Sequence, residues 1–214
     1  MKRIALFMHE PVCDAQCSNG IIKSLEVKYR FKLFGKNEME DSFFDDVDAV
    51  LFPGGVGDAD RFDVVAKKHK PHIQRYLRNG GRYIGVCMGA YWADKNYFDI
   101  LEETRVEQYI KQPGTDTHRP HAKAMPVNWQ GTLRKMFFYD GCTFIGGDQD
   151  VYATYDTGYS MAILQQQGRI GLIGCHPESQ EYWYHKNNYM RRHWHGGHDN
   201  RLFLQFVDTM MEMK

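Results

Sequence analysis

The feature that most constrains this 214-residue chain is segment 81–90, Gly-Arg-Tyr-Ile-Gly-Val-Cys-Met-Gly-Ala, which has the pattern of a short strand entering a tight turn. Cys87 stands between Gly85 and Gly89 in the G-x-nucleophile-x-G frame, with a thiol in place of the usual serine. A side chain at either flanking position would clash in such a strained strand-to-helix corner. The helix that follows directs free N–H groups and its positive end at the sulfur, which favours the thiolate. The frame therefore predicts a strand, a corner, a helix and a nucleophilic cysteine.

A second segment, 174–178, reads Gly-Cys-His-Pro-Glu and follows a short apolar run. His176 offers the imidazole base that a thiol nucleophile needs, and Glu178 offers a carboxylate to orient the ring. The two side chains would otherwise be an ordinary pair on a surface loop. Their position directly after a buried strand, with Pro177 stiffening the link, favours the catalytic interpretation.

Strand and helix patterns alternate through the first half of the chain. Short apolar strands are expected at Ile4–Met8, Tyr29–Phe34, Ala49–Phe52 and Tyr83–Val86. Helices are expected at 19–28, capped by Ser18, and at 60–78. This alternation predicts a parallel sheet covered by helices on both faces, in an α/β three-layer sandwich.

The pattern changes in the middle of the chain. Residues 105–155 are predicted to form an antiparallel insertion of short strands, at 123–129, 133–138, 143–145 and 151–155. The parallel core is expected to resume with Met161–Leu164 and Arg169–Ile173, followed by helices at 180–192 and 200–213. The whole chain, 1–214, is interpreted as a single domain.

Composition excludes several classes of partner. Lys and Arg total 27, and so do Asp and Glu, so the balanced charge offers no footprint for nucleic acid or an anionic membrane. No run approaches the roughly 18–20 apolar residues of a membrane span. The five cysteines form no dense framework and their number is odd, which indicates a reducing, cytoplasmic setting.

Three motifs occur in a characteristic order: Pro53-Gly54-Gly55, the Cys87 frame and the His176 segment. In this order the chain resembles class I glutamine amidotransferase-like proteins over residues 53–178. Within that superfamily, segments 85–91 and 138–142 are most similar to the domain at the N-terminus of eukaryotic biotin–protein ligases and in stand-alone microbial relatives. The resemblance implies a flavodoxin-like fold with a mostly parallel central sheet.

The resemblance also implies a Cys–His–Glu triad, in which Cys87 attacks, His176 acts as base and then acid, and Glu178 orients the imidazole. The oxyanion hole would use the backbone N–H of Met88 and one from the Gly54–Gly55 turn. Fixed donors suit a developing oxyanion, and losing one typically costs about 10²–10³ in rate. No cofactor and no metal are expected.

One position departs from the family pattern. Glutamine-hydrolysing members carry glutamine four residues after the nucleophile, where this chain has Tyr91. We expect a cysteine-dependent amide hydrolase or amidotransferase-like enzyme acting on a small, amide-containing substrate. The alternative is a non-catalytic ligand-binding or regulatory module of the same fold. Neither an ammonia-accepting domain nor the glycine-rich ATP motif of biotin ligation is found. The sequence identifies neither the substrate nor a homo-oligomer or partner subunit.

Other polar residues near the predicted site have competing interpretations. His118 and Arg119 would bind an anionic substrate group or belong to a polar surface loop. Glu10, after the first strand, is interpreted as a solvated loop carboxylate rather than a site residue. Cys175 would pair with Cys87 in a redox-sensitive disulfide or, as we favour, be a small buried residue.

Two further clusters suggest metal ligands. His193, His195 and His198 lie within six residues, but the neighbouring glycines favour a solvated loop. Cys13 and Cys17 have C-x₃-C spacing close to the predicted site. A metal there would need two more ligands from elsewhere in the chain, so a coincidental pair is the preferred interpretation.

Overall fold

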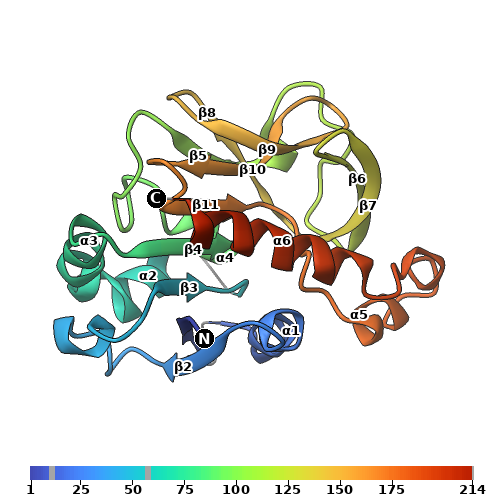
Figure 1. The fold of residues 1–214 in the computed structure, drawn as a ribbon. Coiled ribbons are helices and arrows are strands. Elements are labelled where there is room, and N and C mark those ends of the chain that lie inside the picture. The colour runs from blue at the N-terminus through green and yellow to red at the C-terminus, as the bar shows by residue number, and fades with distance from the viewer. Residues whose placement is uncertain (10–12, 56–58, 214) are drawn as a thin grey trace.

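The computed structural model describes residues 1–9, 13–55 and 59–213. The described residues form an 11-stranded sheet in the order β2-β1-β3-β4-β11-β10-β9-β6-β7, while β8 pairs with β10 and β5 pairs with β8 (Figure 1). The strands are β1 (Arg3–Phe7), β2 (Arg30–Phe34), β3 (Ala49–Phe52), β4 (Arg82–Val86), β5 (Arg105–Gln108), β6 (Lys123–Trp129), β7 (Thr132–Phe138), β8 (Cys142–Ile145), β9 (Asp150–Tyr155), β10 (Ser160–Gln165) and β11 (Ile170–Ile173).

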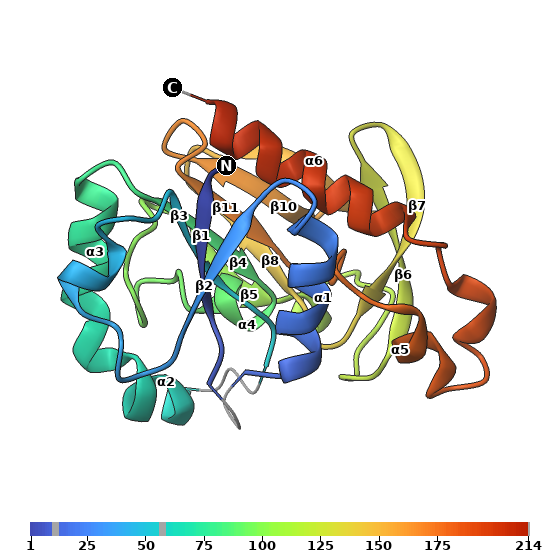
Figure 2. The same cartoon turned by 60° about the horizontal axis from the view of Figure 1, so that its bottom comes forward.

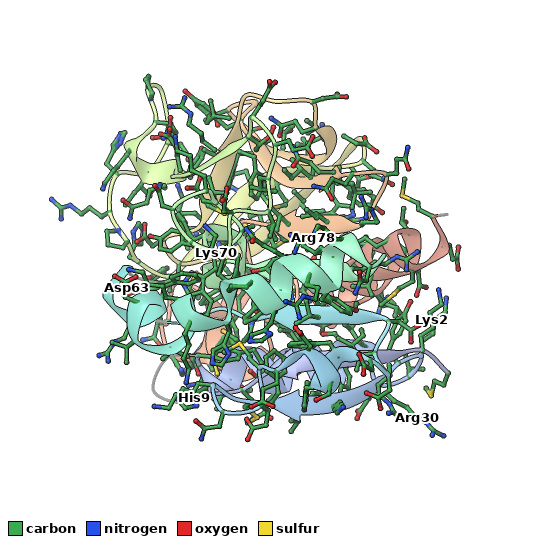
Figure 3. All side chains as sticks on the ribbon, turned by 90° about the vertical axis from the view of Figure 1, so that its left-hand side faces the viewer. Lys2, His9, Arg30, Asp63, Lys70 and Arg78 are labelled. Atoms are coloured by element: carbon green, nitrogen blue, oxygen red, sulfur yellow. The ribbon has the colours of Figure 1, made fainter. Side chains whose placement is uncertain are left out.

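Helices cover both faces of this sheet. They are α1 (Ala15–Leu25), α2 (Ala59–Val65), α3 (Lys70–Arg78), α4 (Met88–Tyr91), α5 (Glu181–His185) and α6 (His198–Glu212), with 3₁₀ turns η1 (Asp41–Phe44), η2 (Lys67–His69), η3 (Tyr109–Lys111) and η4 (Arg191–His193). Helices α1 and α6 lie on one face and α2 and α3 on the other (Figures 1 and 2). Figure 3 looks onto the second face, where Lys70 and Arg78 mark the two ends of α3. The predicted three-layer α/β fold is confirmed.

The central strands are buried on both sides. In β1, Ile4 and Leu6 contribute to the core that contains residues of α1 and α6, whereas Ala5 and Phe7 contribute to the core that contains residues of α2 and α3. Successive side chains of a strand point to opposite faces, so a strand between two helical layers must be apolar throughout. This explains the apolar runs that β1 and β3 show in the sequence.

The parallel part of the sheet comprises β2, β1, β3, β4 and β11. The prediction that Met161–Leu164 continues this parallel core is wrong, because β10 pairs antiparallel with β11. Only the turn around Gln166–Gly168 joins the two strands, and its three residues have positive φ angles of 49°, 56° and 77°. A connection this short makes a hairpin, whereas a parallel crossover needs a dozen or more residues. The antiparallel region therefore extends from β5 to β10.

Two helix boundaries differ from expectation in ways that affect the site. Helix α1 begins at Ala15, because the Asp14 side chain accepts a 2.8 Å hydrogen bond from the Gln16 N–H and caps it. Ser18, the predicted cap, is instead buried inside the helix. The helix predicted over 180–192 is confined to α5 and η4. The earlier start of α1 places Cys17 in its first turn.

Candidate active site

Cys87 occupies the corner between β4 and α4. Its φ of 50° and ψ of −104° lie outside the regions that residues with side chains ordinarily adopt. The Cys87 N–H donates to the Ile173 carbonyl at 2.8 Å, and the Cys87 carbonyl accepts from the N–H groups of Ala90 and Tyr91 at 3.0 Å each. The neighbouring strand and the following turn thus hold the strained backbone in place.

The two glycines of the frame are required by contact with backbone. A Cβ on Gly89 would lie 2.0 Å from the carbonyl oxygen of Phe52, and one on Gly85 would lie 2.5 Å from the carbonyl oxygen of Gly89. Neither neighbour is a flexible side chain, so neither substitution can be relieved by a rotamer change. The predicted steric reason for both glycines is confirmed.

The helix after Cys87 is short. Helix α4 has four residues, so its macrodipole is small and the expected dipole effect on the sulfur is weaker than predicted. The N–H of Gly89 donates to the Pro53 carbonyl at 3.1 Å, whereas that of Met88 has no acceptor among the described residues. The role of the Met88 N–H in an oxyanion hole stays a prediction.

His176 and Glu178 follow β11 and are both buried, with exposed fractions of 4% and 0%. The imidazole Nδ1 and the carboxylate Oε1 are 2.8 Å apart. The His176 N–H donates to the Phe137 carbonyl at 2.8 Å. The amide of Asn200, on α6, donates to the carbonyls of Pro177 and Ser179 at 2.9 and 3.2 Å. Backbone contacts from β7 and side-chain contacts from α6 therefore fix the segment that carries the imidazole.

The imidazole of His176 lies between charged partners. Burial acts to lower the pKa of His176. The charges of Glu178 and Cys87 and the interactions with the thiols of Cys17 and Cys87 outweigh this effect, so the pKa of His176 is well above its ordinary 6.5. The Cys87 thiol also approaches the Tyr139 carbonyl oxygen at 3.9 Å. The arrangement brings Cys87, His176 and Glu178 together and favours an imidazolium beside the Cys87 sulfur.

Cys17 is the site residue that the sequence analysis missed. It is 5% exposed, and its sulfur lies within 4.8 Å of a potential ligand nitrogen of His176. Burial raises the pKa of the Cys17 thiol to about 12, although His176 acts to lower it. A Cβ on Gly54 would lie 2.6 Å from Cε1 of His176 and 2.9 Å from Sγ of Cys17. Gly54 thus leaves room for the ring and the second thiol. The C-x₃-C spacing was the available signal, but it did not reveal the contact with His176.

A cavity of about 640 Å³ opens over these groups. Its lining residues are Cys13, Asp14, Gln16, Cys17, Gly55, Cys87, Ala122, Phe137, Tyr139, His176, Trp183, Lys186 and Asn187. The rings of Trp183 and Phe137 stand edge-on to the imidazole, with centroids 5.6 and 6.0 Å from it. The cavity therefore has aromatic walls beside the imidazole, with Cys87 among its lining residues.

Three predicted substrate-binding residues lie away from this lining. Tyr91 is half-buried, and its hydroxyl donates to the Asp140 carbonyl at 3.2 Å. His118 and Arg119 are exposed. Roles for these three residues in substrate binding stay predictions. Glu10 lies outside the described residues.

The histidine cluster and the remaining cysteines lie in surroundings that bear on their predicted roles. His193, His195 and His198 line a separate cavity of about 520 Å³ together with Arg134 and Asp199. Among the described residues, three potential metal ligands come close together not in this histidine cluster but at Cys17, His176 and Glu178. Cys175 is fully buried, and all five cysteines are reduced thiols.

Comparison with solved structures identifies the fold as that of class I glutamine amidotransferase-like proteins. The PurLQS structure from Thermotoga maritima is 14% identical over 97% of this chain and 98% of that one, with a TM-score of 0.67. A glutamine amidotransferase from the same organism is 14% identical, covers 99% and 98%, and has a TM-score of 0.67. One from Methylobacillus flagellatus is 12% identical, covers 98% and 92%, and has a TM-score of 0.60.

The sequence itself matches a family over part of its length. Residues 11–110, just under half of the chain, match the family described as biotin-protein ligase, N terminal. A comparison with curated proteins found no match. In the described part of the chain, no helix is long and apolar enough to cross a membrane.

Proposed function

We propose that this protein is a cysteine-dependent amide hydrolase or amidotransferase-like enzyme with a Cys87–His176–Glu178 triad. The observation that carries the proposal is the corner at Cys87, whose φ is 50° and which lines the same cavity as the buried imidazole of His176. That imidazole is in turn anchored to Glu178 at 2.8 Å. A nucleophile, a base and an orienting group in this order are the elements that acyl transfer requires.

The reaction follows from these positions. The Cys87 thiolate attacks the amide carbon, and the resulting oxyanion accepts hydrogen bonds from the Met88 N–H and from the Gly54–Gly55 turn. The His176 imidazolium protonates the leaving amine, so that a thioester forms on Cys87. His176 then takes a proton from water, the hydroxide cleaves the thioester, and the carboxylic acid leaves with the thiol restored. No cofactor takes part in these steps.

The substrate is proposed to be a small molecule that carries an amide. A partner subunit that uses the released amine is compatible with this reaction, as is a homo-oligomer. We also propose that residues 1–214 form one domain, because a single sheet continues from β2 to β7 through strands from both halves of the chain.

The second candidate is a ligand-binding or regulatory module that keeps the cavity without turnover. Two observations favour it. The Tyr139 carbonyl approaches the Cys87 sulfur at 3.9 Å, and tyrosine replaces glutamine at position 91. Such a module would have no need of a thiol activated by His176.

The reactivity of Cys87 distinguishes the two functions. We would measure its alkylation by iodoacetamide across the neutral pH range, locating the label by mass spectrometry because Cys13 and Cys17 line the same cavity. His176→Ala is expected to slow labelling of Cys87 about 10²-fold near neutral pH, in line with the usual worth of a positioned base. The exposed His185→Ala is the matched control. Equal labelling in His176→Ala and the native chain would favour the binding module, whereas a specific loss would justify screening glutamine, γ-glutamyl compounds and small amides.

A further inference from the structure

We propose that Cys17, His176 and Glu178 form a zinc-binding site. A thiol sulfur, a ring nitrogen and a carboxylate oxygen from these residues all lie within 4.8 Å of one another. All three residues are at least nine-tenths buried. Cys17 thus finds two partners in the segment after β11, while Cys13 is not among the three grouped residues.

The convergence is built by the docking of α1. Cys17 and Gly20 are three residues apart and therefore share one face of the helix. A Cβ on Gly20 would lie 2.5 Å from the Glu178 carbonyl oxygen, so the helix backbone is packed directly against the 176–178 segment. Gly54 leaves the space in which the Cys17 sulfur meets the imidazole. Two glycines thus allow the close approach of a thiol and the two other ligands.

The donor set favours zinc. Zinc binds thiolate, imidazole and carboxylate in tetrahedral sites, with bonds of about 2.0–2.3 Å. Such bonds place neighbouring ligand atoms roughly 3.3–3.8 Å apart, which small side-chain adjustments would reach from the observed spacing. Magnesium and calcium prefer oxygen ligands and are disfavoured by the sulfur and nitrogen. The fourth position would face the cavity and take a water molecule.

A second observation points to a cation at this place. The Glu178 side chain is fully buried, and its Oε1 pairs with His176, but its Oε2 has no hydrogen-bond partner among the described residues. A buried carboxylate oxygen is rarely left without a partner. A metal ion between the three residues would satisfy it.

Zinc binding and thiol activation would compete for one imidazole. His176 is shared by both arrangements, while Cys87 is not among the three grouped ligands. A bound ion would therefore remove the base from Cys87, and alkylation of Cys87 should slow as zinc is added. This consequence rests on the proposed function, but the metal site itself does not.

Cobalt(II) is the probe for the site, because a thiolate ligand gives a sulfur-to-cobalt charge-transfer band and a tetrahedral site gives strong visible bands. The metal-free full chain would be titrated with cobalt and then with zinc in competition. We expect one ion per chain, and in Cys17→Ser we expect loss of the charge-transfer band with zinc binding at least about tenfold weaker. Glu178→Gln should weaken zinc binding while keeping the band. Thermal unfolding of the metal-free variants shows that each is folded.

The matched controls are the two other thiols of the cavity. Cys87→Ser and Cys13→Ser should keep the charge-transfer band and the zinc affinity. Absence of stoichiometric binding, undiminished binding in folded Cys17→Ser, or loss of the band in Cys87→Ser or Cys13→Ser would overturn the site. Because Cys87→Ser is expected to bind zinc whether or not Cys87 is a working nucleophile, failure of the metal site and failure of the proposed reaction are separate results.

Discussion

The hydroxyl of Tyr91 donates a 3.2 Å hydrogen bond to the carbonyl oxygen of Asp140. The Asp140 carboxylate also accepts from the Gln108 amide at 3.0 and 3.1 Å. Tyr139, the preceding residue, places its carbonyl 3.9 Å from the Cys87 sulfur. The Tyr91 side chain therefore holds a turn of the antiparallel region beside Cys87.

Removing this hydroxyl should destabilise the protein. Tyr91→Phe deletes one hydrogen bond and leaves the carbonyl of the half-buried Asp140 without that donor, so we expect the free energy of unfolding to fall by about 1 kcal/mol. The free energy of unfolding is measured by urea denaturation. Tyr182→Phe, at an exposed tyrosine of α5, is the control and should change the free energy little. An equal effect of both variants would contradict the structural role of the Tyr91 bond.

The stability contributed by His176 should depend on pH. The pKa of His176 is raised above its ordinary 6.5 in the folded chain, so the folded state binds the proton more tightly than the unfolded state. The resulting stabilisation is fully present below pH 6.5 and is lost as the pH rises through the folded-state value. The difference in unfolding free energy between the native chain and His176→Asn should therefore be largest at acidic pH. Urea titrations in a pH series test this, and a difference that grows toward alkaline pH would refute it.

Asp199 should lower the stability of the folded chain at neutral pH, whereas His176 raises it. Burial raises the pKa of Asp199 to about 7 from 3.8, although the charge of Arg134 acts to lower it. Ionising this carboxyl costs stability, and the cost grows as the pH rises from 3.8 through 7. Asp199→Asn is expected to be more stable than the native chain above pH 7, by roughly 1–4 kcal/mol, and to match it more closely at pH 4. Asp45→Asn, at an exposed site, should show no such trend in thermal or urea unfolding.

Alanine substitutions at Gly89 and Gly80 distinguish the stability cost of a steric clash from that of backbone strain. Gly89→Ala would drive a Cβ to 2.0 Å from the Phe52 carbonyl oxygen and should cost more than about 3 kcal/mol or prevent folding. Gly80 has a φ of 91°, and a Cβ at this position would meet no described atom within 4 Å, so Gly80→Ala carries the conformational cost alone, about 1–2 kcal/mol. The two variants are compared by thermal unfolding and by the yield of soluble protein. Similar losses in both variants would contradict the tight packing of α4 on β3.

The docking of α1 can be tested at Gly20. Gly20→Ala would place a Cβ 2.5 Å from the Glu178 carbonyl oxygen, so α1 or the 176–178 segment must move. We expect lower stability, by about 1–3 kcal/mol, together with slower alkylation of Cys87. Asn19→Ala lies at an exposed position of the same helix and should preserve both properties. Unchanged alkylation in Gly20→Ala would show that the position of α1 does not influence His176.

Local patterns in the sequence predicted the features that depend on neighbouring residues. The corner at Cys87 is one of them, because Gly85 and Gly89 are excluded from bearing side chains by atoms within a few residues or on the adjacent strand. The short apolar runs of β1, β3 and β4 are another, since burial on both faces leaves no room for alternation. The order of the three motifs was enough to indicate the fold that the structure confirms.

Features that depend on how distant segments pack were decided by the tertiary structure. An apolar run such as 161–164 carries no information on strand direction, and the hairpin turn to β11 made it antiparallel. Cys17 resembled a loop cysteine until the Asp14 cap placed it in α1 and the docking of that helix brought it to His176. The sequence by itself determined the backbone corner and the apolar layers, because these follow from sterics and periodicity over short spans. Only the fold decided which thiols lie beside the imidazole, because the first helix must meet the segment that follows the last strand.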